Sequence, residues 1–122
     1  MTMNPFNLQD RLINFAVLII EISKSLTKSY EGMHLSKQII RSGTSPALHY
    51  GEAQSAESRK DFIHKVKWVL KELRETHANL KIIKRAELSD DSDLIDKAQK
   101  ETHELSSIFV VSAKTARRND GG

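Results

Sequence analysis

Cysteine is absent from this chain of 122 residues, which also contains only two prolines and five glycines. The absence of cysteine excludes disulfide bonds, thiol chemistry and thiolate metal sites, and we expect a reducing, cytoplasmic setting. Because proline and glycine mark turns, their scarcity predicts a few long elements within a single domain. No stretch shows the polar–apolar alternation of a strand, so we expect these elements to be helices.

Long hydrophobic runs are also missing. The most apolar run, Leu12 to Ile20, would rise only about 14 Å as a helix, roughly half of a bilayer core. We therefore expect no membrane segment and interpret the run as a buried helix. It is apolar around more than one face, so another subunit is one candidate for its cover. The first ten residues lack the basic flank and cleavage site of a secretory signal.

Charged residues are plentiful, at 29% against 39% hydrophobic residues, and the net charge is +3. This balance is typical of amphipathic helices that present a charged surface to water. A small positive excess is compatible with a nucleic-acid partner but does not require one.

Apolar residues recur at alternating spacings of four and three in several long segments. They predict four helices, at about residues 7–28, 34–55, 58–85 and 89–116. Short connections between helices of this length favour an all-α fold, an antiparallel up-down-up-down four-helix bundle. We expect Asn7, Ser58 and Ser89 to cap helices, with Asp61 at the capping-box position after Ser58, and the residues after 116 to form a fraying basic tail.

Small and helix-breaking residues cluster in the second predicted helix, where Ser42, Gly43, Ser45 and Pro46 follow one another closely. Relative to alanine, glycine destabilises a helix by about 1 kcal/mol and proline by about 3 kcal/mol. We therefore expect the shape of these residues to offset that loss. One interpretation is a bend at Pro46, or a helix that restarts there after a cap at Thr44 or Ser45. The other is a close-packed contact with a neighbouring helix or subunit.

Residues for catalysis are poorly represented. There is no phosphate-binding loop and no nucleophile turn. The one Glu-x-x-His match, Glu31 to His34, falls in a predicted loop, whereas di-metal bundles need two such pairs and further glutamates. The remaining acids and histidines of the second and third helices are better explained as polar groups that pair with Arg41 or Arg74. We predict no enzyme activity, no cofactor and no metal.

A basic stripe runs along the third predicted helix and suggests an anionic partner. Lysines and arginines there repeat at seven-residue intervals or adjoin that column, and two more arginines follow in the tail. A nucleic-acid backbone fits this arrangement, although a solvated lysine-rich face, partly neutralised by nearby acids, is the alternative. The candidate phosphate-binding residues are Lys60, Lys67, Lys71, Arg74, Lys81, Arg117 and Arg118.

Trp68 and Ile82 share an outward column of the same helix. Exposed large apolar side chains on a polar face are typical of an interaction surface, and tryptophan is enriched at subunit interfaces. We therefore assign both residues to an oligomer interface. The alternative role for Trp68 is to stack a nucleic-acid base beside the lysines.

The segment from Gln38 to Ile83 resembles a bacterial family of proteins encoded in intervening sequences of 23S ribosomal RNA genes, also known as S23 ribosomal proteins. The resemblance rests on Arg-Ser-Gly-Thr-Ser, Tyr-x-Glu-Ala, Ser-x-x-Asp-Phe-Ile and Leu-Lys-Glu-x-x-Glu-Thr. The residues that carry it are Arg41, Ser42, Gly43, Thr44, Ser45, Tyr50, Glu52, Asp61, Phe62, Glu72 and Glu75. This chain has His49 before the tyrosine, where the family often has asparagine.

The resemblance implies a four-helix bundle that assembles into a homopentamer and has a role related to nucleic acid. One related branch is the accessory protein of diversity-generating retroelements, which implies a reverse transcriptase as a possible partner. We expect the motif to be structural, with Arg41 meeting Glu52 or Glu72. The rival to nucleic-acid binding is a scaffold that binds only other proteins.

Overall fold

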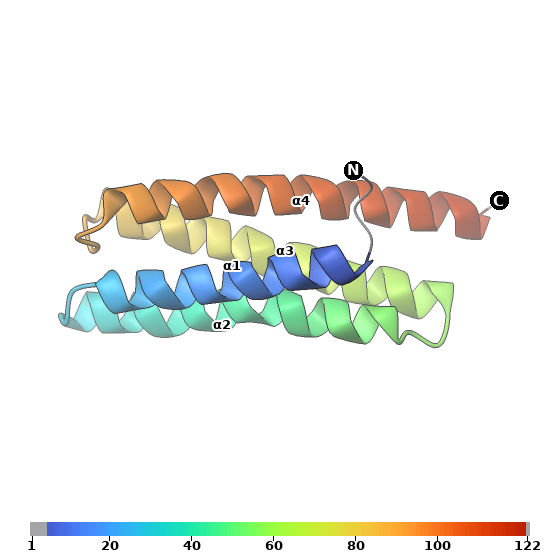
Figure 1. The fold of residues 1–122 in the computed structure, drawn as a ribbon, viewed down its shortest axis with the longest axis horizontal. Coiled ribbons are helices and arrows are strands. Elements are labelled where there is room, and N and C mark those ends of the chain that lie inside the picture. The colour runs from blue at the N-terminus through green and yellow to red at the C-terminus, as the bar shows by residue number, and fades with distance from the viewer. Residues whose placement is uncertain (1–4, 122) are drawn as a thin grey trace.

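The computed structural model describes residues 5–121, in which short connections join four antiparallel helices. They are α1 (Pro5–Ser25), α2 (Tyr30–Gln54), α3 (Arg59–Arg85) and α4 (Ser92–Gly121), and they run alternately up and down the bundle (Figure 1). The predicted all-α four-helix bundle is confirmed. None of these helices has the length and apolar character needed to cross a membrane.

The core forms where the apolar seams of the four helices meet. Its largest fully buried side chains include Phe15 of α1, Ile39 of α2, Leu73 of α3 and Phe109 of α4. Removing this apolar surface from water is the main term that favours the fold. Each helix packs most closely on its neighbour in the chain, and α1 and α4 meet over a smaller contact. The pair α1 and α3 therefore lies diagonally across the bundle.

Helix α3 begins as the sequence predicts. The Ser58 hydroxyl accepts a hydrogen bond from the Asp61 backbone N–H at 3.0 Å. The Asp61 carboxylate in turn accepts from the Glu57 N–H at 3.4 Å, one residue earlier than a capping box would place it.

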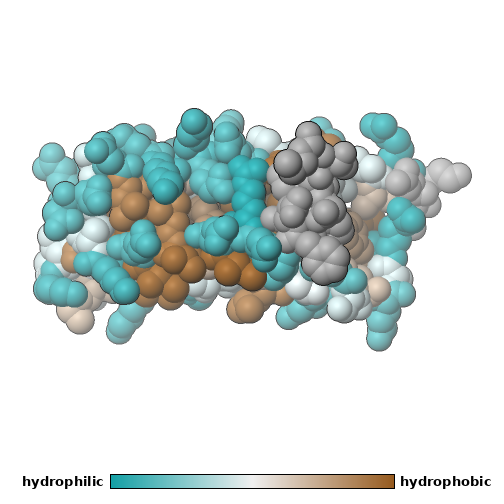
Figure 2. All heavy atoms as spheres, in the orientation of Figure 1, coloured by the Kyte–Doolittle hydropathy of each residue, from teal (hydrophilic) through white to brown (hydrophobic). Residues whose placement is uncertain are grey.

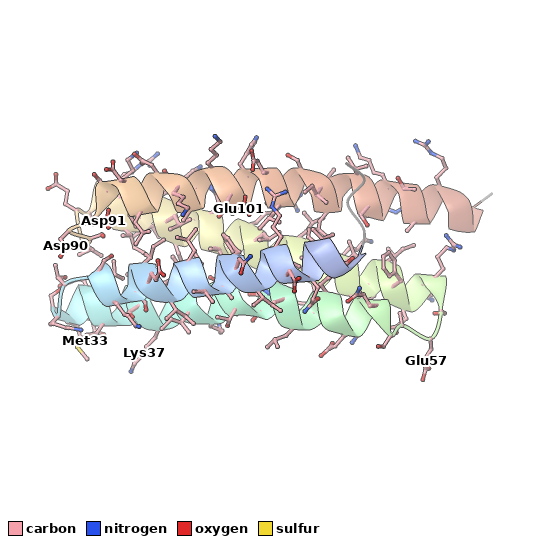
Figure 3. The ribbon with its side chains drawn as sticks, viewed as in Figure 1. Met33, Lys37, Glu57, Asp90, Asp91 and Glu101 are labelled. Carbon is pink, nitrogen blue, oxygen red and sulfur yellow. The ribbon has the colours of Figure 1, made fainter. Side chains whose placement is uncertain are left out.

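The other two predicted caps are wrong. Helix α1 begins at Pro5, so Asn7 lies within its first turn; proline suits that position because its fixed φ is helical and no N–H is lost. Helix α4 begins at Ser92, and the Asp91 carboxylate accepts from the Leu94 N–H at 3.1 Å (Figure 3). Ser89 instead accepts from the Asp91 N–H and so shapes the preceding turn.

The turn between α1 and α2 is shorter than predicted. Helix α1 ends at Ser25 instead of 28, and α2 begins at Tyr30 instead of 34, behind a cap at Ser29. Gly32, expected in the loop, lies in α2. A Cβ atom at this position would stand 2.0 Å from the Thr27 carbonyl oxygen, so only glycine lets the turn fold back this closely.

Helix α2 continues without interruption through Pro46, so the predicted restart is wrong. The hydroxyls of Thr44 and Ser45 do not cap; each donates to the carbonyl four residues earlier at 2.7 Å. The close-packed interpretation is confirmed at Gly43, where a Cβ atom would lie 2.6 Å from the Ile19 side chain. The neighbour is α1 of the same chain.

Helix α4 extends to Gly121, past the predicted end at 116. Arg117 and Arg118, expected in a fraying tail, are therefore helical and exposed. Their positions are fixed relative to the preceding turns of α4.

Candidate nucleic-acid interface

A groove of about 740 Å³ runs between α3 and α4, towards the C-terminal end of α4. We call it the α3/α4 groove. Its lining combines aliphatic side chains with cations and one carboxylate. The lining residues are Lys67, Leu70, Lys71, Arg74, Glu75, Ala78, Val110, Ala113, Lys114 and Arg117.

The rims of the groove are strongly positive. Lys67, Lys71 and Arg74 come from α3, and Lys114 and Arg117 come from α4. All five are exposed, and no ion pair within the described residues engages any of them. Within the described part of the chain, the lining contains one carboxylate, that of Glu75, which already binds Arg41 outside the groove. Five cations held this close repel one another, so an anion that binds there gains their combined attraction.

Four of the seven predicted phosphate-binding residues meet in this groove: Lys67, Lys71, Arg74 and Arg117. The other three, Lys60, Lys81 and Arg118, are exposed on the same two helices but lie outside its lining. Lys60 and Lys81 continue the predicted stripe along α3 on either side of the groove.

Lys114 lines the groove but is not among the predicted phosphate-binding residues. It lies three residues before Arg117, and this spacing places both on one side of a helix. The signal was therefore present in the sequence. The prediction ends this helix at 116 and leaves Arg117 without a helical face, so it does not align Arg117 with Lys114.

Two histidines lie on the same side of the bundle, where α3 and α4 meet. Burial, followed by the nearby charges of Lys81 and His103, lowers the pKa of His77. The lowered pKa favours the neutral form of the His77 ring. Its Nδ1 atom is buried and has no hydrogen-bond partner among the described residues.

The family-motif residues tie α2 to α3. The Arg41 guanidinium donates to the buried Glu72 carboxylate at 3.0 Å and also to Glu75. The hydrogen bond to Glu75 and the charge of Glu72 raise the pKa of Arg41. The expected Arg41–Glu72 contact is confirmed, but the alternative partner Glu52 is wrong, since it binds Lys65 of α3 at 3.0 Å.

Beside this ion pair lies a buried hydrogen-bonded cluster. Ser42 Oγ is fully buried, 2.9 Å from Thr76 Oγ1 and 3.3 Å from Asn79 Nδ2. Tyr50, another motif residue, packs edge-on against Phe109 in the core with ring centroids 5.4 Å apart. Phe62 packs against the same core. These contacts place most of the motif residues in the packing between helices, although Glu75 also lines the groove.

Trp68 lies at the surface as predicted, but its own helix and α2 partly cover it. The indole N–H donates to His64 Nε2 at 3.2 Å, the His49 ring stacks on it, and Lys71 Nζ stands 4.4 Å from the ring centroid. The Lys71 ammonium gains a cation–π attraction there. Trp68 does not line the groove, and Ile82 is half exposed on the same side of α3.

Metal-binding geometry is absent from the described residues, in which no three His, Asp or Glu side chains gather. Glu31 and His34 both lie in α2, which corrects their expected place in a loop. His34 lies 3.1 Å from the Gln38 amide, and the Glu52 carboxylate near His49 binds Lys65.

Comparison with known proteins agrees with this architecture. The family model described as 23S rRNA-intervening sequence protein matches residues 6–110. The chain is also similar to a solved structure, a protein of unknown function from the S23 ribosomal protein family of Bacteroides thetaiotaomicron VPI-5482. Sequence identity is 32% and the TM-score 0.81, over 92% of this chain and 99% of that one. No curated protein matches the chain. The chain belongs to the 23S rRNA-intervening sequence protein family.

Proposed function

We propose that this protein is a non-enzymatic, oligomeric helical bundle of the cytoplasm that binds RNA or DNA through the α3/α4 groove. The supporting observation is that five exposed cations from two helices converge on one groove without an ion-pair partner among the described residues. A phosphate backbone is the common biological ligand that presents negative charges in series. Lys60, Lys81 and Arg118 extend the positive surface along the same two helices.

Self-association is part of the proposal, with the homopentamer implied by the family resemblance. Figure 2 shows a broad apolar area over α1, where Ile13, Val17 and Ile20 remain exposed. We call these three residues the α1 apolar face. Contiguous apolar surface of this kind is typical of protein interaction sites. Trp68 and Ile82 are further candidates for a subunit contact.

The alternative function is a protein scaffold without nucleic-acid binding. The same α1 apolar face favours the scaffold, because a different protein could cover this surface just as a second subunit could. A reverse transcriptase is one such partner by family resemblance. Binding of nucleic acid at low salt distinguishes the two functions, since the scaffold requires none.

The test is a salt-titrated binding assay that compares two triple variants with equal loss of charge. In the groove variant, Lys67→Gln, Lys114→Gln and Arg117→Gln remove three rim cations. In the control variant, Lys24→Gln, Lys28→Gln and Lys37→Gln remove three exposed lysines of the α1/α2 side of the bundle.

For the wild type, we expect affinity for RNA to fall steeply as salt rises. The groove variant should reduce the slope of log K against log salt by about 2 to 3, because each lost phosphate contact removes about 0.7 to 0.9. The control variant should change the slope by less than 1. Equal effects of the two variants would refute the groove as the binding surface, and no binding at low salt would favour the scaffold.

A further inference from the structure

The floor of the α3/α4 groove is aliphatic, in contrast to its rims. Leu70 and Ala78 of α3 and Val110 and Ala113 of α4 line it. Ala78 is exposed and Val110 is half buried, so both are accessible from the groove. A site built only for phosphates has no use for a concave apolar floor. The floor therefore indicates a ligand with both apolar faces and negative charges.

Duplex nucleic acid does not match this combination well. Its bases are stacked inside the helix, and its outer surface offers phosphates and sugars to the protein. Unpaired nucleotides expose their flat base faces beside the phosphates, as proteins that bind single strands exploit. In this groove the base would lie on the floor and the flanking phosphates at the two cationic rims. Arg74 adds a planar guanidinium that can stack on a base.

The length of the positive surface separates a polymer from a small amphiphilic anion. Exposed cations follow α3 from Lys60 to Arg85, about 38 Å along the helix axis at 1.5 Å per residue. A small anion would need only the groove. The cations beyond both of its ends are positioned for a strand that continues past it.

We infer that the α3/α4 groove binds unpaired nucleotides of single-stranded RNA or DNA, with base faces on its aliphatic floor and phosphates at its basic rims. This inference rests on the proposed function and adds the class of nucleic acid. Among the described residues, no aromatic side chain lines the groove, so the expected preference among the four bases is small.

The test measures fluorescence anisotropy of the full chain with four labelled ligands of equal strand length. These are a 12-nucleotide single-stranded RNA, the same sequence as DNA, its 12-base-pair duplex, and a DNA strand of abasic sites. The abasic strand keeps the phosphates and lacks the bases. We expect both normal single strands to bind about tenfold more tightly than the abasic strand, because bases on the aliphatic floor bury apolar surface. They should also bind more tightly than the duplex.

A floor variant locates the effect. Ala78→Gln covers the floor with a polar amide, changes no charge and suits a helix, and Ala86→Gln makes the same change at the exposed end of α3. The Ala78→Gln protein should lose at least five-fold of its preference for normal over abasic strands and keep its salt slope. The Ala86→Gln protein should match the wild type.

Each remaining outcome contradicts a specific statement. Equal binding of duplex, abasic and normal strands, weakened by the groove triple variant, would overturn this inference and leave the proposed function intact. A base preference that survives Ala78→Gln would overturn the placement of the base on the floor. Absence of binding to all four ligands at low salt would overturn both proposals.

Discussion

At position 43 the side chain is a single hydrogen atom, and α1 approaches α2 closely there. An added methyl group would lie 2.6, 2.7 and 2.9 Å from three carbons of the Ile19 side chain, including its Cβ. Ile19 is fully buried and branched at that atom, so it cannot rotate out of the way. The helices themselves would have to move apart.

Gly43→Ala should therefore destabilise the protein although alanine is the better helix former. Overpacking a core costs about 1–3 kcal/mol, while the gain in helix propensity is about 1 kcal/mol. We expect a net loss of about 1 kcal/mol in the free energy of unfolding, measured by urea denaturation.

Gly51→Ala is the matched control, because it makes the same change in the same helix. A methyl group at Gly51 would come no closer than 3.8 Å to its nearest neighbour, Gln9. This variant should be as stable as the wild type or more stable by up to about 1 kcal/mol. If both alanine variants gain stability, the close contact between Gly43 and Ile19 does not affect the free energy of unfolding.

At the scale of the elements, an ion pair between Arg41 of α2 and Glu72 of α3 joins the two helices beside the apolar core. The Glu72 side chain is only 5% exposed, and Arg41 covers it from α2 while also binding Glu75. An ionised carboxylate at that depth needs a charged or hydrogen-bonding partner.

Arg41→Ala should lower the free energy of unfolding by about 1–3 kcal/mol, because it leaves a buried carboxylate without its partner. Lys84→Ala provides the comparison: it removes a 2.7 Å ion pair with Asp96 in which both side chains are about half exposed. That variant should lose at most about 1 kcal/mol. Unchanged stability in Arg41→Ala, together with weaker RNA binding, would show that the motif arginine serves the ligand instead of the fold.

The helices could be predicted from the sequence more reliably than their ends. The apolar seam and the Ser58 cap placed α3 within one residue, since both signals are local. The start of α4 was misplaced because Ser89 and Asp91 are both good caps, and only the observed fold of the turn selects Asp91. Gly32 predicts a break in the helix, but the structure places it inside α2, where it packs closely on Thr27.

The candidate site could also be predicted only in part from the sequence. Heptad spacing within α3 was sufficient to group Lys67 with Arg74, because those positions depend on one helix alone. Their convergence with Lys114 and Arg117 depends on how α3 and α4 align, and this register is set by side-chain packing along the whole interface. The choice of Glu72 over Glu52 as the partner of Arg41 depends in the same way on the register of α2 and α3.

For the whole molecule, the two candidate surfaces lie on different sides of the bundle. The α1 apolar face looks outward from α1, which is diagonal to α3, and α1 lies in front of α3 in Figure 1. Across the narrow contact between α1 and α4, Arg11 binds Glu101 at 2.7 Å and also Glu104 (Figure 3). In a closed pentamer the α1 apolar face of one subunit meets a different surface patch of the next subunit. We predict that this second patch lies outside the α3/α4 groove, so that the groove stays open in the assembly.

This arrangement predicts that assembly and nucleic-acid binding respond to different substitutions. Val17→Glu places a charge in the middle of the α1 apolar face, where the wild-type side chain is 50% exposed, so the isolated chain should still fold. Burying that charge between subunits would be unfavourable, and light scattering should show the assembly reduced to the 13.8 kDa chain. Val111→Glu, at a position of α4 that is 63% exposed, is the control and should leave the mass unchanged. A wild-type mass of 13.8 kDa would refute self-association.

If Val17→Glu dissociates the assembly, each separated chain should keep its groove and its salt-dependent binding. Affinity for long RNA should then fall towards that of one groove, because linked sites bind a single strand more tightly than separate ones.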